Sequence, residues 1–459
     1  MTAGTTARTT ARPTTATRWA AGWLLLAWAA PAAAGGMFLP ARGARALGVA
    51  GSMTASVDDG SALYYNPAGF SEVDGIGTLI DFGVVLQRVG YDRVDSGGNP
   101  QPHVHGDMNV LPIPTLALSY RLPSHPALTL AGGVWTPYLG VESWPDDGPQ
   151  RYSAVSLNGS LLAVLELAAA YRVNDQLSVG LGLQDMVINF RSRVALSACS
   201  QLNCAPEDPG FDALTELRTS SYFTPSAIVG ATYQLGPVRT GLAVQLPFFV
   251  RTSGTAESRL PTDPQYVNAA QVGDGVSADF DLPLEIRLGA AMRPRPDLSV
   301  EVGADYEMWS MQKDISIEAH DIRITGVPGI GTYMFDKIGI ARDLRDTFAL
   351  HAGAEWEALP HTLVVRAGYL FETSATPDRT ASVLTPDGLH NLVSGGVGLW
   401  ARGLRFDLGY GHLFTRDRSV TGSDALQLNP IQPSLAVPVG NGRYTVATDI
   451  LSAGVAGRF

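Results

Sequence analysis

The sequence predicts an all-β protein: a 14-stranded antiparallel transmembrane β-barrel with an N-terminal plug, or hatch, in its lumen. Three observations predict this fold. Apolar and polar side chains alternate with a period of two, the alternating segments often have eleven or more residues, and short connections alternate with long ones. In 404–414 the even positions are apolar or aromatic apart from His412, whereas the odd positions include Arg405 and Asp407. Such a segment has one apolar and one polar face.

A soluble β-sandwich would alternate in the same way, with its apolar face inward. Length favours the barrel, because a tilted strand needs roughly nine to eleven residues to cross a bilayer, whereas globular strands usually have about five or six. Aromatic residues near the segment ends also favour it, since barrels carry aromatic girdles at both membrane interfaces. These residues are Tyr91, Tyr120, Trp135, Tyr138, Trp309, Phe371, Trp400 and Phe414.

The connections predict the number of strands. Tight turns are expected at 173–176, 235–237 and 402–403, and long polar loops near 92–108, 197–221, 259–277, 320–345, 373–389 and 415–441. The fourteen segments begin near residues 77, 109, 127, 154, 177, 222, 238, 279, 297, 346, 361, 390, 403 and 443. An even number places both ends of the barrel on the periplasmic side. The last segment alternates up to Phe459, and a terminal aromatic residue is typical of outer-membrane proteins.

The first 34 residues have the composition of a secretory signal peptide. Arg8, Arg12 and Arg18 precede the apolar stretch 19–30, and the small residues of 32–34 follow it. The stretch is too short for a membrane-spanning helix, and a buried amphipathic helix is the alternative. With the barrel pattern, this segment predicts a protein of the Gram-negative outer membrane.

The charge balance argues against nucleic acid as a partner. The 459 residues include 32 Lys and Arg against 43 Asp and Glu, a formal net charge of −11, and phosphate binding requires clustered basic residues. Length alone suggests about three soluble domains, but no linker-like segment separates them. We divide the chain into a signal peptide (1–34), a hatch (35–75) and a barrel (76–459).

The segment before the barrel does not alternate and is rich in Gly and Ala. Asp58, Asp59 and Asn66-Pro67 are turn formers, and the small residues permit close backbone packing. A segment of this kind can fold inside a barrel lumen as a plug. A flexible periplasmic leader is the alternative.

Little in the sequence indicates catalysis or a metal, and we expect no enzyme activity, cofactor or metal ion. Cys199 and Cys204 suit a local disulfide in an exported protein. A metal site is the weaker reading, because no second pair of ligands completes it. The sequence 103–107, His-Val-His-Gly-Asp, has ligand-like spacing, but we interpret it as an ordinary loop. No hydrolase, zinc-protease or nucleotide motif occurs, although a barrel-embedded lipase with Ser and His far apart in sequence stays open.

The hatch motif carries a resemblance to a known family. Asp58-Asp59 followed by Asn66-Pro67-Ala68 resembles the N-terminal hatch of the FadL/TodX long-chain fatty-acid transporters. Later segments resemble the family in the same order: 151–154, 170–183, 282–283, 309–310, 364–369, 386–387 and the final Phe459. The resemblance implies a 14-stranded barrel that takes up hydrophobic molecules, such as long-chain fatty acids or hydrocarbons, passively across the outer membrane. We expect a monomer surrounded by outer-membrane lipid and lipopolysaccharide.

By this resemblance, ligand capture begins in a hydrophobic groove made by extracellular loops. The expected groove residues are Phe211, Leu214, Leu217, Tyr222, Phe223, Phe248 and Phe249, with lipid-facing girdle positions as the alternative for several of them. A carboxylate head would need a cation in a site of low dielectric constant. The residues expected to supply it are Arg191, Arg193 and Arg345, and a solvated strand-end arginine is the alternative for each.

The third predicted strand, 127–137, contains Gly132, Gly133 and Pro137, residues that mark bulges or broken pairing inside a strand. In the family a kink in this strand opens the wall beside the hatch, so the resemblance implies a lateral exit here. A plain strand end is the alternative. Charged residues on the polar faces are expected to pair with one another and to hold the hatch. They are Glu285, Arg287, Glu301, Asp305, Glu307, His351, Glu355, Arg366, Arg405 and Asp407.

The alternative function is a general diffusion porin for small polar solutes. The Gly- and Ala-rich segment before residue 75 separates the two functions, because a porin begins its first strand almost at the mature N-terminus.

Overall fold

The computed structural model describes residues 39–107, 110–137, 142–200, 204–335, 337–384 and 386–459. The predicted signal peptide, residues 1–34, lies outside these ranges. Among the described residues, no helix is both long enough and apolar enough to cross a membrane.

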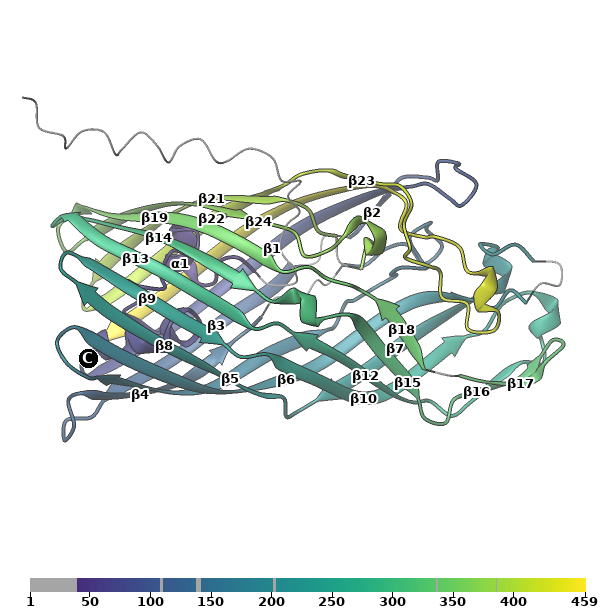
Figure 1. Cartoon of the computed structure of the whole chain (residues 1–459), viewed down its shortest axis with the longest axis horizontal. Coiled ribbons are helices and arrows are strands. Elements are labelled where there is room, and N and C mark those ends of the chain that lie inside the picture. Colours follow the sequence, from purple (N-terminus) through teal and green to yellow (C-terminus); the bar gives the residue numbers. More distant parts are fainter. Residues whose placement is uncertain (1–38, 108–109, 138–141, 201–203, 336, 385) are drawn as a thin grey trace, which may run out of the picture. The chain divides into compact units, whose positions relative to one another are not determined.

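The strands form a closed antiparallel wall, as the sequence predicts (Figure 1). The first strand, β1 (Ile76–Arg93), pairs with β3 (Val110–Arg121) on one side and with the last strand, β24 (Gly442–Arg458), on the other. Pairing of the first strand with the last removes the open edges that a bilayer cannot accommodate. The prediction of fourteen wall strands is confirmed.

Five wall strands are divided into two named segments, and the others have one named segment each. Besides β1, β3 and β24, the single segments are β4 (Leu128–Trp135), after which the third wall strand loses its ladder pairing, β5 (Leu161–Arg172), β6 (Leu177–Ser197), β20 (Leu363–Glu372), β21 (His390–Ala401) and β22 (Leu404–Thr415). The divided strands are β7 and β8 (Asp212–Ser221, Pro225–Leu235), β9 and β10 (Val238–Gln245, Phe248–Arg259), β12 and β13 (Gly275–Leu282, Glu285–Arg295), β14 and β15 (Leu298–Glu307, Asp314–Ala319), and β18 and β19 (Ile338–Ala341, Thr347–Leu359).

Short elements extend the wall or lie in the long connections. The strands β2 (Val104–His105) and β23 (Arg418–Val420) pair with the ends of β1 and β24. A separate small sheet consists of β11 (Ala270–Val272), β16 (Arg323–Val327) and β17 (Gly331–Met334). The 3₁₀ turns of the connections are η2 (Pro209–Phe211), η3 (Pro264–Tyr266), η5 (Asp378–Thr380) and η6 (Pro433–Leu435).

The alternation is inverted relative to a soluble protein. On β22, Phe406, Leu408 and Tyr410 are 42%, 59% and 48% exposed, whereas Arg405 and Asp407 on the opposite face are 5% and 3% exposed. The apolar face therefore points outward and the charged face into the lumen, as a transmembrane barrel requires.

Three expected boundaries are wrong. The fourth strand begins at Leu161 rather than near 154, and the sixth reaches back to Asp212, so the expected loop 197–221 is shorter. The expected loop 320–345 contains β16, β17 and β18. In both loops, short apolar alternations such as Ile338-Gly-Ile340 extend the wall, and the surrounding polar residues obscured them.

The hatch, described from Leu39, lies inside the barrel and consists of α1 (Ala44–Gly48), α2 (Ala62–Tyr65) and η1 (Pro67–Glu72) (Figure 1). Its backbone lies directly against the wall. A Cβ atom at Gly368 would lie closer than 3.0 Å to the carbonyl carbon of Val49, a separation that real Cβ atoms essentially never show. Gly368 faces Gly353 across β19 and β20, so the hatch rests on a smooth part of the wall.

Candidate functional site

A cavity of about 510 Å³ lies at the end of the barrel that carries the long connections, which is the extracellular end. Lys337, Arg342 and Asp424 contribute charge to its lining. Most of the remaining lining is apolar and comes from β6, β7, β12, β15 and the segments 333–335, 337–341 and 424–439. The larger apolar residues include Phe190, Leu196, Leu217, Val276, Ile315, Ile317, Tyr333, Phe335, Ile338, Ile340, Leu426 and Leu428.

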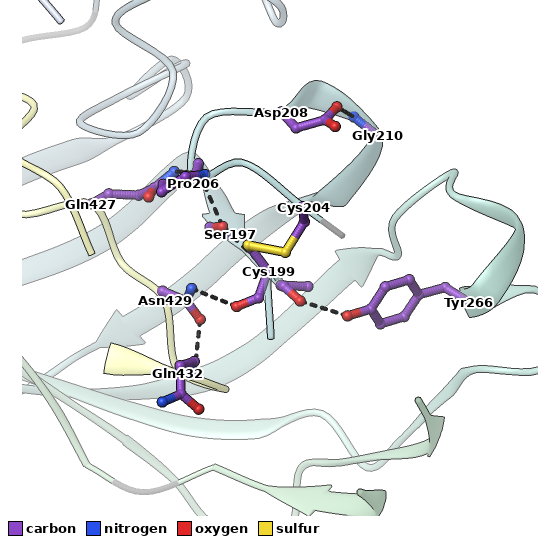
Figure 2. Close-up of a disulfide and its surroundings, with 11 residues drawn as sticks. Ser197, Cys199, Cys204, Pro206, Asp208, Gly210, Tyr266, Gln427, Asn429 and Gln432 are labelled. Carbon is purple, nitrogen blue, oxygen red and sulfur yellow. Dashed lines mark hydrogen bonds between the residues drawn. A yellow bond between two sulfur atoms is a disulfide. The ribbon is translucent and has the colours of Figure 1, made fainter. Parts of the chain in front are cut away.

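One rim of the cavity is braced by a disulfide between Cys199 and Cys204 (Figure 2). The carbonyl of Cys199 accepts a hydrogen bond from Asn429 Nδ2 at 2.9 Å, and the carbonyl of Pro206 accepts one from Gln427 Nε2 at 2.6 Å. Because Gln427 and Asn429 line the cavity, the disulfide-closed loop positions part of its wall.

The ten residues expected to bind ligand are all described; Leu217 lines this cavity and the other nine do not. Phe223 and Phe249 are 74% and 56% exposed on the outer face. Phe248 is buried in the core, Phe211 packs edge-on against Tyr266 beside the disulfide, and Leu214 is buried on β7. The two arginines on β6 do not line the cavity because successive side chains of a strand point to opposite faces.

Phe190 and Ser192 point into the cavity, so Arg191 and Arg193 lie on the opposite face of β6. Arg193 pairs with Asp146 at 2.8 Å, and Arg345 is exposed before β19. Sequence reasoning missed the cavity residues between 315 and 340 because it read most of that stretch as a polar loop. The apolar pairs Ile315-Ser-Ile317 and Ile338-Gly-Ile340 were the available signal.

A layer of closely packed apolar side chains extends from the cavity to the hatch. Phe190 and Ile315 of the cavity pack against this layer. The layer also reaches Trp135 and Val164, and it contacts Leu63 of the hatch. Its other large members are Leu162, Met186, Ile188, Phe248, Val250, Phe280, Leu282 and Trp309. Apolar contact is therefore continuous from the cavity to the third strand.

The third wall strand is interrupted next to the hatch. Trp135 is the last residue of β4 that pairs with Thr115 of β3 and Val164 of β5. Pairing resumes at Ser143, through isolated bridges to Asp107 and Ser156. Of the described residues between them, Thr136, Pro137 and Glu142, none takes part in a ladder. We call this stretch the β4 interruption.

The neighbouring strand is adapted to this interruption. β3 keeps its ladder with β1 through Pro112 and Pro114, which have no N–H to donate. Proline is tolerated in a sheet where its nitrogen faces away from the paired strand, so these two positions leave no unpaired donor on the side of the interruption. Gly133 is still paired within the wall. Only glycine fits at this position, because a Cβ atom there would lie closer than 3.0 Å to the Leu116 carbonyl and to Leu63.

The interruption between β14 and β15 is different, because side chains replace the missing ladder. Gln312 Oε1 accepts a hydrogen bond from the backbone of Asp281 at 2.6 Å. Asp346 accepts hydrogen bonds from the backbone of Ser310 at 2.8 Å and from the Tyr306 hydroxyl at 2.6 Å. This interruption is thereby bonded to both neighbouring strands.

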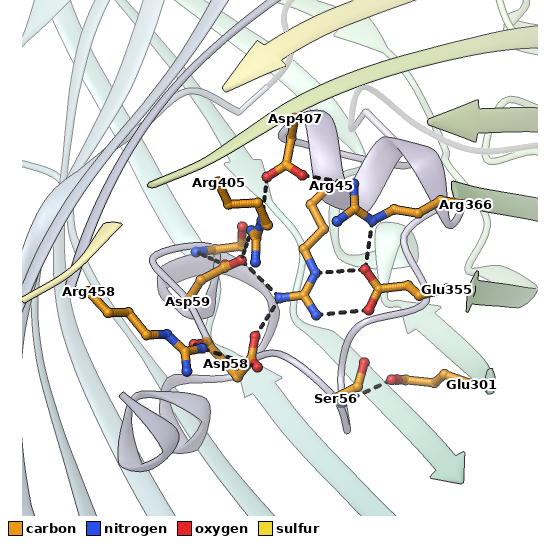
Figure 3. A network of polar contacts seen from close by, with 11 residues as sticks. Arg45, Ser56, Asp58, Asp59, Glu301, Glu355, Arg366, Arg405, Asp407 and Arg458 are labelled. Carbon is orange, nitrogen blue, oxygen red and sulfur yellow. Dashed lines mark hydrogen bonds and ion pairs between the residues drawn. The ribbon is translucent and has the colours of Figure 1, made fainter. Parts of the chain in front are cut away.

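Ion pairs connect the hatch to β19, β22 and β24 (Figure 3). Asp59 accepts hydrogen bonds from Arg405 at 2.6 Å and from Arg45 at 3.0 Å. Arg45 also pairs with Glu355 at 2.8 Å and with Asp58. Burial acts to raise the pKa of the Asp59 carboxyl, but the two guanidinium groups outweigh burial and hold that pKa well below its usual range.

The expected pairing of lumenal charges is confirmed where these contacts occur. Arg366 pairs with Asp407 at 2.8 Å and also with Glu355, and Glu301 accepts hydrogen bonds from the hatch backbone at Ala55 and Ser56.

The remaining hatch motif residues shape the end of the hatch. Asn66 Oδ1 accepts a hydrogen bond from the backbone of Ala68 at 3.1 Å, which caps η1, and Pro67 occupies the first position of that turn. Asn66 Nδ2 donates to the carbonyls of Thr54 at 2.9 Å and Ala231 at 3.1 Å. Asn66 thus connects η1 to the preceding part of the hatch and to β8.

A closed barrel with a lumenal hatch, an apolar cavity on the outer side and an interrupted wall strand defines an outer-membrane transport protein for hydrophobic molecules. A family model described as "Outer membrane protein transport protein (OMPP1/FadL/TodX)" matches residues 24–459, and the chain belongs to this family. A search of curated proteins gave no match.

Solved structures show the same fold. A Pseudomonas aeruginosa FadL homologue is similar with a TM-score of 0.77 and 18% identity over 93% of this chain and 100% of the homologue. The Ralstonia pickettii toluene transporter TbuX gives 0.63 and 18%, and the P. putida toluene transporter TodX gives 0.64 and 14%; each match covers 92% of this chain and 99% of the transporter. The porin alternative is therefore not favoured.

Proposed function

We propose that hydrophobic small molecules enter the outer cavity, cross the apolar layer and leave sideways through the β4 interruption into membrane lipid. The ligands are long-chain fatty acids or hydrocarbons, and the toluene transporters among the similar structures support the second class. The observation that carries the proposal is the loss of ladder pairing after Trp135, beside a hatch that fills the periplasmic end.

A sideways route suits an apolar ligand because transfer from an apolar site to water costs about 25 cal/mol per Å². A straight route through the hatch would require breaking buried ion pairs and would end in the aqueous periplasm. The sideways route keeps the ligand in contact with apolar groups throughout. It requires only the part of the hatch beside Trp135, around Arg42 and Leu63, to rearrange.

Uptake by cells tests the proposed route. Leu162 is 2% exposed and faces the lumen beside the interruption, whereas Leu161 is 54% exposed on the lipid side. We expect Leu162→Trp to abolish most uptake of labelled 1-dodecanol by filling the inner mouth of the exit, and Leu161→Trp to leave uptake unchanged. Assembly of both variants is checked by heat-dependent mobility in gels.

Equal uptake by the two variants would contradict the lateral route. Liposome swelling with sugars tests the coarser point, because a channel closed by its hatch should show no swelling where a porin does.

A further inference from the structure

Glu166 is a buried carboxylate beside the β4 interruption that the transport route does not explain. It is 3% exposed and faces the lumen from β5, directly opposite Gly133. Its Oε2 accepts hydrogen bonds from Trp135 Nε1 at 3.1 Å and from Gln184 Nε2 at 2.9 Å. Glu166 therefore holds the indole at which the ladder of β4 ends.

The charge of this carboxylate is not compensated by an ion pair within the described part of the chain. Its Oε1 is buried and accepts no hydrogen bond there. Arg287 exerts an electrostatic attraction on Glu166, but its guanidinium is paired with Glu285 and donates to the Tyr64 carbonyl at 2.7 Å. The other lumenal carboxylates near the hatch, such as Asp59 and Glu355, contact arginines directly.

The position of Glu166 places it on the route to the exit. Val164, which pairs with Trp135, and Leu162 belong to the apolar layer and lie on the same face of β5 as Glu166. A ligand that passes between this layer and the interruption comes within one side chain of the carboxylate. Water cannot screen the charge effectively in this buried position.

We propose that Glu166 is a charge filter that favours uncharged ligands over carboxylates at the exit. This inference rests on the lateral route proposed above. Two like charges about 6 Å apart, at an effective dielectric constant of about 20, disfavour one another by more than about tenfold. A neutral ligand of the same shape escapes this penalty, and the hydrogen-bonded Trp135 still gives it an ordered apolar surface.

The test compares uptake of 1-dodecanol with that of dodecanoate, its carboxylate counterpart, at pH 8.5, where Glu166 and dodecanoate are both ionised, in Gram-negative cells without their own uptake channel for such molecules. Glu166→Gln removes the charge but can still accept from Trp135 and Gln184. We expect its ratio of dodecanol to dodecanoate uptake to fall about tenfold through faster dodecanoate uptake. Glu318→Gln, which removes an exposed carboxylate on β15, should keep the wild-type ratio.

A second variant keeps the inference testable if Glu166→Gln assembles poorly. Gln184→Glu adds a carboxylate next to Glu166 and should lower dodecanoate uptake further without changing that of dodecanol. An unchanged ratio in both variants, with normal dodecanol uptake by the wild type, would overturn the charge filter alone. A wild-type channel that takes up neither molecule would overturn the filter together with the proposed function.

Discussion

The hatch contacts the barrel wall in two different ways. Towards β19, β22 and β24 it is held by buried ion pairs, in which Arg45 and Asp59 contact Glu355 and Arg405. Towards β4 the contacts are mainly aromatic and apolar: the rings of Tyr64 and Trp135 meet edge-on at 5.2 Å, and Leu63 faces Gly133. Arg42 Nε adds a hydrogen bond to the Thr136 carbonyl at 3.2 Å.

The difference shows which side of the hatch a ligand can displace. Removing one partner of a buried ion pair typically costs about 3–5 kcal/mol, and a hydrophobic molecule offers nothing to replace it. Apolar contacts are non-directional, so a ligand can substitute its own surface for that of Tyr64 or Leu63. The ion-paired side therefore holds the hatch in place, while the β4 side can yield.

Neutralising Asp59 is the strongest way to test the ion-paired side. We expect Asp59→Asn to destabilise the protein by about 3 kcal/mol, the lower end of the range for a broken buried pair, because Arg45 and Arg405 keep Glu355 and Asp407. Denaturant unfolding in detergent measures this change. The hatch should also become more mobile. This is measured by maleimide labelling of a cysteine that replaces Met53, a residue that is 1% exposed, and the labelling should be faster in Asp59→Asn.

Asp74→Asn is the matched control for Asp59→Asn. Asp74 pairs with Arg121 at 3.4 Å, but its side chain is 87% exposed, so the pair contributes at most about 1 kcal/mol. If the two substitutions destabilised the protein equally, the ion-paired side would not be what holds the hatch.

The fold was predictable because period-two alternation can be read from the sequence of each segment alone, without knowing which strands pair with it. The segments around β22 and β24 could be located to within two residues, since both alternate regularly, and on β22 the polar face carries charges while the apolar face carries aromatic residues. The start of the sixth strand was missed because 212–221 reads as a polar loop, although it pairs with both β6 and β10. Its few apolar residues, Ala213, Leu214 and Leu217, lie among polar ones.

The cavity was less predictable, because it depends on which face of each strand points inward at the extracellular end. Arg191 and Phe190 are neighbours in sequence, and only the register of β6 with its partners decides that Phe190 lines the cavity. The β4 interruption left a clearer signal. Pro112 and Pro114 on β3, together with Pro137 in the interruption itself, indicate unpaired edges on these two neighbouring strands.

Packing of the hatch backbone against glycines offers a second, smaller test of the ion-paired side. Gly368→Ala should destabilise the protein by about 1–3 kcal/mol, because the new methyl group would overlap the backbone of Val49 and no flexible side chain can give way. The change is measured by denaturant unfolding. Gly395→Ala on the adjacent strand is the control, since a Cβ atom there would be 3.5 Å from the Arg366 carbonyl, an ordinary contact. Equal stability of the two variants would show that the hatch adjusts freely even on this side.

The smallest effect on stability, and an opposite effect on transport, is expected on the β4 side. In the wild type the Arg42 guanidinium packs on the rings of Tyr64 and Trp135, at 4.0 and 5.3 Å from their centroids. Arg42→Met removes the hydrogen bond to the Thr136 carbonyl, which contributes about 1 kcal/mol. The methionine thioether keeps the contact with the two rings. If rearrangement beside β4 limits transport, the initial rate of dodecanol uptake should rise by up to about fivefold, the equivalent of that loss. Slower uptake, or labelling at Met53 as fast as in Asp59→Asn, would mean that both sides of the hatch hold it equally.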